Sequence, residues 1–248
     1  MSGHSKWSTI KREKGAADAK RSKVWTKLVK EITIAARLGG GDPAGNPRLR
    51  RAIDAGRAAN MPNENLSRAI KKGTGELEGQ AYEEILYEGV GPSGCLFVMK
   101  IMTDNRNRTA AEVRRIFDKN GGSMGVSGSS TWAFAQKGVL RLPQANATEE
   151  QLFEVAVGAG AEDVQLADDR WVVITPREAL DTVRDALDKA KIAGVAGGLE
   201  FVPTTPKEVS GDDAKVLLHL FEALDDHDDV QNVYADFELS DATLASLE

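Results

Sequence analysis

The charge of this 248-residue chain is divided between two segments of opposite sign. The first 73 residues hold 17 lysines and arginines against six acidic residues, which gives a net charge of +11. Because the whole chain carries −6, residues 74–248 carry −17. A chain of this length is expected to form two or three compact units rather than one core. The change of charge therefore predicts that a basic domain ends close to residue 76.

The basic segment has the pattern of three short helices. Apolar residues recur at helical spacing over residues 18–38. Asn46 and Pro47 predict the N-terminus of a second helix. A third helix is expected over residues 63–72, with Gly73 as its C-terminal stop. Short turns between them make a small helical bundle.

The first predicted helix has one cationic face. At 100° per residue its basic side chains cluster opposite the apolar stripe, and only Ile34 interrupts them. We expect this face to be available to a polyanion. The residues that form it are Lys20, Lys23, Lys27, Lys30 and Arg37.

The segment that follows the bundle predicts two strands, a helix and a third strand. Residues 82–89 and 95–103 have strand patterns on either side of a Gly-Pro-Ser-Gly turn. Thr109 and Glu112 have the spacing of a capping box that opens a helix. Thr131–Ala135 is the expected third strand.

Residues 138–203 predict a complete β-α-β-β-α-β unit, the split arrangement of ferredoxin-like domains. After it, Ser210 caps a predicted helix, and residues 230–239 alternate as a strand. These two elements supply the helix and the strand that residues 82–136 lack for a complete unit of the same kind. A free helical hairpin after two consecutive domains is the alternative.

The expected fold class is therefore α+β with three domains. A basic helical bundle precedes two ferredoxin-like α/β domains, and the third domain is inserted in the second. The predicted domains are residues 1–76, residues 77–136 with 205–248, and residues 137–204.

No cofactor, metal or catalytic set is expected. His4, His219 and His227 are too few and too far apart in the sequence for a nucleophile triad. The acidic run Asp225–Asp229 matches neither zinc nor calcium ligand spacing, so a solvated structural loop is favoured over a metal site. The glycines at 39–41 lack a phosphate-loop motif. We expect a protein that is not an enzyme.

The remaining composition indicates an ordinary cytoplasmic protein. The lone Cys95 lies in an apolar run and is expected to be buried in a strand. No apolar run approaches the length of a membrane helix, and the first residues lack the apolar core of a signal peptide.

Two interpretations of Asp104–Arg108 remain open. This stretch places Arg106 and Arg108 between a predicted strand and a helix N-terminus, where phosphate oxygens are favoured. Alternatively it is a polar loop whose arginines pair with Glu112 and its neighbours.

Nucleic acid is the expected partner of the basic segment, because neutralising phosphates releases condensed counterions. A solvated helical surface is the alternative. Residues 1–17 predict a flexible basic arm with Trp7 as its one aromatic residue, and no finger or zipper spacing is present, so backbone contact is favoured over base readout. The candidate contact residues are His4, Lys6, Trp7, Lys11, Arg12, Lys14, Lys20, Arg21, Lys23, Lys27, Lys30, Arg48, Arg51, Arg57, Arg106 and Arg108.

The chain resembles the YebC/PmpR family over essentially its whole length. The resemblance rests on the motifs Gly3-His4-Ser5-Lys6-Trp7, Gly39-Gly40-Gly41-Asp42-Pro43, Asn46-Pro47-Arg48-Leu49, Ala58-Ala59-Asn60-Met61-Pro62, Gly73-Thr74-Gly75-Glu76-Leu77, Tyr87-Glu88-Gly89 with Gly91-Pro92, and Thr103-Asp104-Asn105-Arg106-Asn107-Arg108-Thr109. It implies three domains, no recognised enzymatic activity, and a role as a transcriptional regulator in bacteria or a translational activator in mitochondria.

The leading hypothesis is thus a non-enzymatic, DNA-binding transcriptional regulator, expected to be monomeric and without a membrane partner. A protein partner for the acidic α/β part stays open. The rival hypothesis is a translation factor that binds ribosomal RNA, because phosphate contacts do not distinguish DNA from RNA. An enzyme in the α/β part is disfavoured, since no acid, base and nucleophile converge in the sequence.

Overall fold

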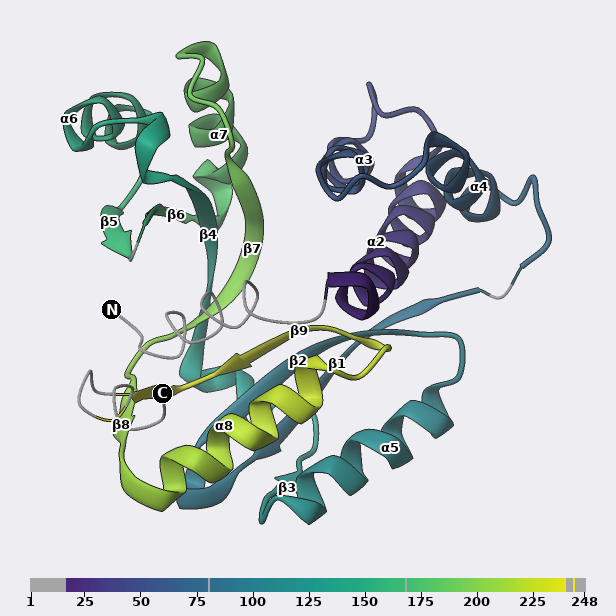
Figure 1. The fold of residues 1–248 in the computed structure, drawn as a ribbon, viewed down its shortest axis with the longest axis vertical. Helices are drawn as coiled ribbons and strands as arrows, with labels where there is room; N and C mark the ends of the chain where they lie inside the picture. The colour runs from purple at the N-terminus through teal and green to yellow at the C-terminus, as the bar shows by residue number, and fades with distance from the viewer. Residues whose placement is uncertain (1–16, 80, 168, 240–242, 244–248) are drawn as a thin grey trace. The chain divides into compact units, whose positions relative to one another are not determined.

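The computed structural model describes residues 17–79, 81–167, 169–239 and 243, with side chains from residue 22 onward. In this part of the chain the fold is mixed α/β, with two four-stranded antiparallel sheets (Figure 1). The described residues divide into two compact units. One unit comprises residues up to Ser130 together with Ser210–Ala235, and the other comprises Thr131–Val209 with residues from Asp236.

Three helices form the basic part of the first unit, as the sequence predicted: α2 (Ala17–Gly39), α3 (Pro47–Ala58) and α4 (Asn63–Thr74). The Asn46 side chain caps α3 by accepting a hydrogen bond from the Leu49 amide, and Pro47 begins the helix. Ile32, Leu49 and Leu66, one from each helix, meet in a shared apolar core. Their burial drives the association of the three helices, of which the 12-residue α3 and α4 are too short to be stable by themselves.

The stop signal of α4 differs from the prediction. Gly75, with φ of 83°, adopts the left-handed conformation that ends the helix, two residues after the expected Gly73. Gly73 is buried inside α4, where an added Cβ would lie 2.4 Å from the carbonyl oxygen of Thr33 on α2. Gly73 is therefore a point of close approach between the two helices, because no larger residue fits there.

The sheet of the first unit has the order β3-β1-β2-β9. Its strands are β1 (Glu83–Val90), β2 (Leu96–Thr103), β3 (Ser123–Met124) and β9 (Val230–Ala235). The helices α5 (Arg106–Lys119) and α8 (Gly211–Asp225) pack on the face that carries Phe97, where Phe117 of α5 meets the Phe97 ring edge-on. The late strand β9 thus completes the sheet by pairing with β2, which lies about 130 residues earlier in the chain.

The second unit has the order β5-β6-β4-β7, with all pairs antiparallel. Its elements are β4 (Phe134–Pro143), α6 (Glu149–Leu152) continuing as a π-helical turn (Phe153–Val157), β5 (Asp163–Ala167), β6 (Arg170–Pro176), α7 (Leu180–Lys189) and β7 (Ala196–Pro203). The predicted β-α-β-β-α-β order of elements is confirmed. The core of this unit includes Leu140, Trp171 and Leu187.

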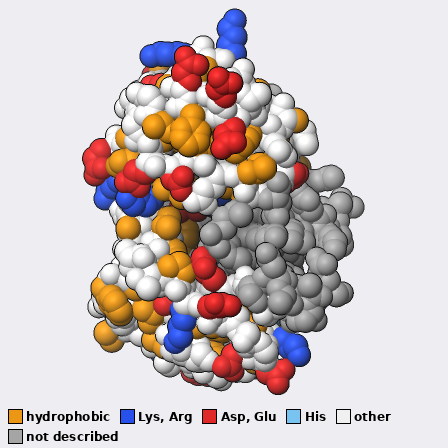
Figure 2. Space-filling model, turned by 90° about the vertical axis from the view of Figure 1, so that its left-hand side faces the viewer, with side chains coloured by type: hydrophobic (Ala, Val, Ile, Leu, Met, Phe, Trp, Pro, Cys, Tyr) orange, Lys and Arg blue, Asp and Glu red, His pale blue; other side chains and the backbone are white. Residues whose placement is uncertain are grey.

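Short 3₁₀ turns and one small sheet complete the described elements. The turns are Pro92–Gly94, Thr131–Ala133, Gln144–Asn146 and Arg177–Ala179. The strands β8 (Lys207–Val209) and β10 (Phe237–Leu239) pair in parallel. None of the described helices is both long and apolar enough to span a bilayer. Figure 2 shows carboxylates scattered among apolar side chains on the side of the molecule where α6 and β5 lie in Figure 1.

Two strand predictions were wrong. The strand expected at Thr131–Ala135 is a 3₁₀ turn followed by the beginning of β4, which runs unbroken to Pro143 because Phe134 and its neighbours pair with β7. The first unit fills that sheet position with the two-residue β3 instead. The single strand expected over residues 230–239 is interrupted at the buried Asp236, so that β9 and β10 belong to different sheets.

Candidate nucleic-acid interface

Only part of the predicted interface lies within the described residues. His4, Lys6, Trp7, Lys11, Arg12 and Lys14 lie outside them. Lys20 and Arg21 belong to α2, but their side chains are not described. The side chains of Lys23, Lys27, Lys30, Arg48, Arg51, Arg57, Arg106 and Arg108 can be placed.

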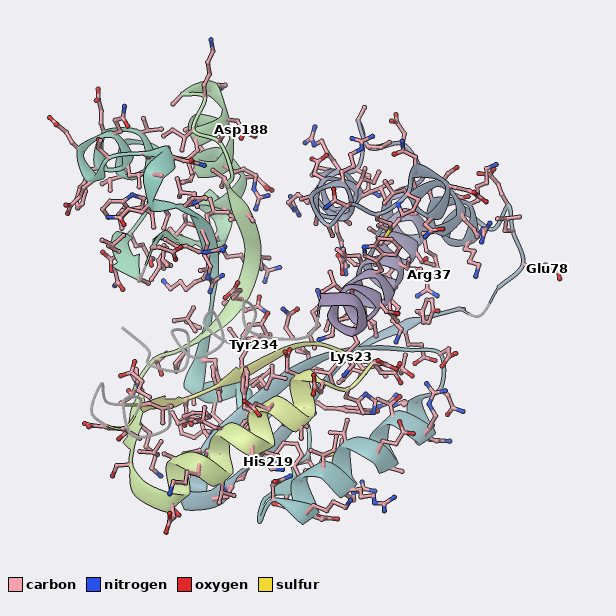
Figure 3. All side chains as sticks on the ribbon, viewed as in Figure 1. Lys23, Arg37, Glu78, Asp188, His219 and Tyr234 are labelled. Atoms are coloured by element: carbon pink, nitrogen blue, oxygen red, sulfur yellow. The ribbon has the colours of Figure 1, made fainter. Side chains whose placement is uncertain are left out.

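The cationic face of α2 is covered by the acidic turn between α8 and β9. Lys23 pairs with Asp226 at 3.3 Å, Lys27 with Asp225 at 3.4 Å, and Lys30 with Asp229 at 2.5 Å. Figure 3 labels Lys23 where α2 approaches the end of α8. Ile34, the apolar exception on this face, is buried with an exposed fraction of 1%. The face expected to meet a polyanion thus meets carboxylates of the same unit.

The three ion pairs differ in how deeply their side chains are buried. The side chains of Lys23 and Asp226 are 45% and 70% exposed, whereas those of Lys30 and Asp229 are 7% and 6% exposed. An exposed pair contributes roughly 0–1 kcal/mol to stability, because water screens it. Removing one partner of a buried pair costs about 3–5 kcal/mol, because an uncompensated charge remains inside. Lys30 and Asp229 are therefore the structurally important members.

Asp229 is the centre of a buried polar network. One carboxylate oxygen accepts from Lys30, and the other accepts from Thr109 at 2.6 Å, Arg108 at 2.8 Å and Thr103 at 3.2 Å. Burial by itself would raise the pKa of Asp229, but hydrogen bonds from Lys30, Thr109 and Arg108, together with the charge of Lys30, hold that pKa well below its usual value. The carboxylate stays ionised and joins α2, β2, α5 and the α8–β9 turn.

The start of α5 explains how Arg108 and Thr109 reach this network. The predicted capping box at Thr109 is wrong: Asn105 is the N-cap and accepts from the Arg108 amide at 3.1 Å. The helix therefore begins four residues earlier, and Thr109 lies buried within its first turns. Arg108 bonds Asp104 at 2.9 Å and lies 3.9 Å from Glu112, which favours the polar-loop interpretation of this stretch for Arg108.

The side chains of the acidic turn between α8 and β9 are engaged in hydrogen bonds within the protein. Within the described part of the chain, Glu112, His227 and Asp229 form the one group whose ligand atoms, all within 4.8 Å, could hold a metal. The His227 ring instead accepts from the Asp229 amide through Nδ1 at 3.1 Å, and its Nε2 lies 3.0 Å from Glu112. Asp229 is already neutralised by two cations. This donor set gives a divalent ion little to bind.

Arg48 belongs to a second ion network. Its guanidinium pairs with Glu31 at 2.7 Å and with Glu84 at 2.8 Å, and Glu84 also pairs with Lys100 at 3.0 Å. Burial would lower the pKa of Arg48, but hydrogen bonds and charges from Glu31 and Glu84 raise it. Burial would raise the pKa of Glu84, and Lys100 and Arg48 lower it. The network connects α2 and α3 to the sheet.

The other described candidates are more accessible. Arg57 is 64% exposed and lies 3.6 Å from Asp54 of the same helix. Arg106 is exposed at the start of α5, where its carbonyl accepts from the Tyr87 hydroxyl at 3.2 Å. Arg51 is half-buried and has an interaction partner. These residues do not converge with the α2 lysines on one site.

Sequence reasoning placed Arg37 on the cationic face of α2 but missed several other exposed cations. Within the described residues, none of the following has a carboxylate at ion-pair distance: Arg37, Arg50, Lys71 and Lys72 of the helical part, and Arg114, Arg115 and Lys119 of α5. The last three lie in the acidic part of the chain, so a charge count by segment hides them. Their helical spacing was the available signal.

The fold defines a class of protein in which a basic three-helix segment is joined to antiparallel sheets with packed helices. Residues 5–76 match the family described as "TACO1/YebC protein N-terminal domain", and residues 82–237 match "TACO1/YebC second and third domain". The chain belongs to the TACO1/YebC family, and the resemblance drawn from its motifs is confirmed.

Relatives of full length share about half of their residues with this chain. A "probable transcriptional regulatory protein" of Geobacter sulfurreducens is 52% identical over 247 residues and covers 100% of both chains. One from Desulfatibacillum aliphaticivorans is 54% identical and covers 97% of this chain and 98% of its own. The crystal structure of a conserved hypothetical protein from Aquifex aeolicus is 42% identical, with a TM-score of 0.86, 91% of this chain covered and 93% of that one.

We expect Asp229→Asn to lower the free energy of unfolding by about 3–5 kcal/mol, because it leaves Lys30 buried without its counter-charge. Asp226→Asn, in the exposed pair of the same turn, is the matched control and should cost about 1 kcal/mol or less. Chemical denaturation followed by circular dichroism measures both. Equal losses from the two substitutions would contradict the proposed difference.

The stability that is lost in Asp229→Asn should depend on pH. Because folding lowers the pKa of Asp229, its contribution is fully present above the ordinary aspartate pKa of about 4 and fades as the pH falls toward the depressed folded value. The difference between the wild type and Asp229→Asn should therefore be constant near neutrality and shrink below about pH 4. A difference that grew in acid would have the wrong sign.

Proposed function

We propose that this protein is a non-enzymatic regulator that binds the backbone of nucleic acid, with DNA as its first target. The observation that carries the proposal is the net charge of +11 over the first 73 residues. Exposed cations without a carboxylate partner among the described residues support it. Uncompensated surface charge of this sign attracts phosphates and releases their counterions on binding.

The ion pairs divide the cations into two groups. Lys30 and Arg48 are held by buried or half-buried carboxylates, so their contribution is to stability. Arg37, Arg50, Lys71 and Lys72 are exposed and are the described contacts that we propose, together with the basic residues that precede α2. Arg50 lies on α3, and the two lysines lie on adjacent positions of α4.

The absence of enzymatic activity and of a cofactor is part of the proposal. Catalytic groups commonly have shifted pKa values. The lowered pKa values of Asp229 and Glu84 have a different explanation, because each carboxylate is engaged by two or more cations that also hold elements together. We further propose that the protein acts in the cytoplasm and as a monomer.

The names of the relatives support a role in regulating transcription. A ribosome- or ribosomal-RNA-associated role in translation uses the same phosphate contacts, and no feature of the described residues favours it specifically. We therefore retain DNA as the first target and treat preference for RNA as an outcome of the binding test.

We also infer a three-domain organisation: a helical domain, a discontinuous α/β domain and an inserted α/β domain. The sheet of the second unit, β5-β6-β4-β7, has the strand order of ferredoxin-like folds, whereas the first unit has the different order β3-β1-β2-β9. The inserted domain has its own apolar core, which supports independent folding.

A fragment of residues 131–209 should fold by itself if this inference holds. We expect a cooperative thermal transition by circular dichroism and dispersed amide signals by NMR, because the core of the fragment needs no residue from elsewhere. A fragment without a cooperative transition would contradict the inserted-domain organisation.

Charge reversal on α4 tests the binding proposal. Lys71→Glu/Lys72→Glu should weaken binding to a short duplex DNA and lower the slope of log affinity against log salt by about two, because two phosphate contacts are lost. Fluorescence anisotropy at several salt concentrations gives both quantities, and repeating it with RNA of the same sequence gives the preference.

Lys189→Glu/Lys191→Glu is the matched control, because it reverses two exposed lysines in the other unit. It should leave the salt slope unchanged. Equal effects of the two double variants would show that binding depends on net charge alone, and this would contradict a site on the helical part. Tighter binding to RNA than to DNA would favour the role in translation.

A further inference from the structure

A polar groove of about 850 Å³ lies within the first unit, between α2 and α5. The α2 side is lined by Lys23, Thr26 and Lys30, which recur at helical spacing. The α8–β9 turn closes one end with Asp226 and its neighbours. Basic side chains from two helices that are far apart in the sequence thus line one surface.

The α5 side of the groove is a stripe along one helix face. Arg108, Glu112, Arg115 and Lys119 follow one another at spacings of four, three and four residues. Arg115 and Lys119 are exposed, and neither has a carboxylate partner among the described residues. They are exposed, unpaired cations on the wall of a groove that is also lined by the carboxylates Asp104, Glu112, Asp226, Asp228 and Asp229.

We propose that this groove binds a phosphodiester strand, with Arg115 and Lys119 on α5 and Lys23 on α2 as its cationic contacts. The inference rests on the proposed nucleic-acid function and assigns part of that interface to α5, outside the basic segment. Arginine and lysine on a groove wall are the usual donors to phosphate oxygens.

The aromatic content of the groove favours backbone contact over base stacking. Two of the residues that line the groove carry aromatic rings, and these are Tyr82 and His227. The Lys30 ammonium already lies 5.7 Å from the centre of the Tyr82 ring, so a cation occupies that face. The His227 ring is engaged by Glu112 and the Asp229 amide. Neither ring offers a stacking surface for a base.

The acidic turn acts as an intramolecular competitor for the strand. Asp226 pairs with Lys23 and Asp225 with Lys27 through exposed or half-exposed contacts, which phosphates can replace at little cost. Lys30 and Asp229 are buried and stay paired. Binding in the groove would therefore exchange the Asp226 carboxylate for a phosphate on Lys23 and leave the buried network intact.

Two opposing variants of the full chain test the groove. Arg115→Glu/Lys119→Glu should weaken binding of a labelled single-stranded DNA at least several-fold and lower its salt slope by about two. Asp225→Asn/Asp226→Asn should strengthen binding and raise the slope, because Lys23 and Lys27 lose these two carboxylate charges. Arg115→Gln/Lys119→Gln repeats the first arm with smaller disturbance, and circular dichroism verifies that each variant is folded.

Asp212→Asn/Asp213→Asn is the control for loss of acidic charge, because it removes two exposed carboxylates from the first turn of the same helix α8. It should change affinity less than Asp225→Asn/Asp226→Asn. If the wild type binds and the α5 variants bind equally well, or if Asp225→Asn/Asp226→Asn does not bind more tightly, the groove proposal is overturned while the proposed function stands. Failure of both the wild type and Asp225→Asn/Asp226→Asn to bind DNA or RNA overturns both.

Discussion

A single buried carboxylate, that of Asp229, is the interaction on which the first unit depends. It accepts from Lys30 of α2, from Thr103 of β2, and from Arg108 and Thr109 of α5. These donors come from three segments, and Asp229 itself lies about 200 residues after Lys30. A buried charge without such donors would cost several kcal/mol. The network therefore joins the helical bundle to the first strands and to the late tail.

This network changes the meaning of the charge division. The basic segment carries +11, yet part of that charge is compensated by carboxylates from the acidic remainder, with Lys30 held by Asp229 and Arg48 by Glu84. Opposite net charges thus bring the two parts of the unit together. Exposure decides which function a given cation serves, because buried pairs are strong and specific whereas exposed pairs exchange readily with other anions.

Local signals predicted local structure well. Asn46 and Pro47 specified the start of α3, and the β-α-β-β-α-β pattern of residues 138–203 is that of the observed elements. Signals that depend on distant partners failed. Thr109 has the spacing of a capping box, but its hydroxyl is used by Asp229, which the sequence places 120 residues away. Ile34 was the one visible sign that the cationic face of α2 is packed, and no property of α2 by itself identifies the acidic turn that covers it.

The most direct test of this account is a double-mutant cycle on Lys30 and Asp229. The free energy of unfolding is measured for the wild type, Lys30→Met, Asp229→Asn and the double variant. The account predicts a coupling energy of about 2 kcal/mol or more, with the double variant more stable than the sum of the single losses implies, because removing both charges leaves neither one buried and unpaired. Losses that add to within about 0.5 kcal/mol would show that the two side chains act independently and would contradict it.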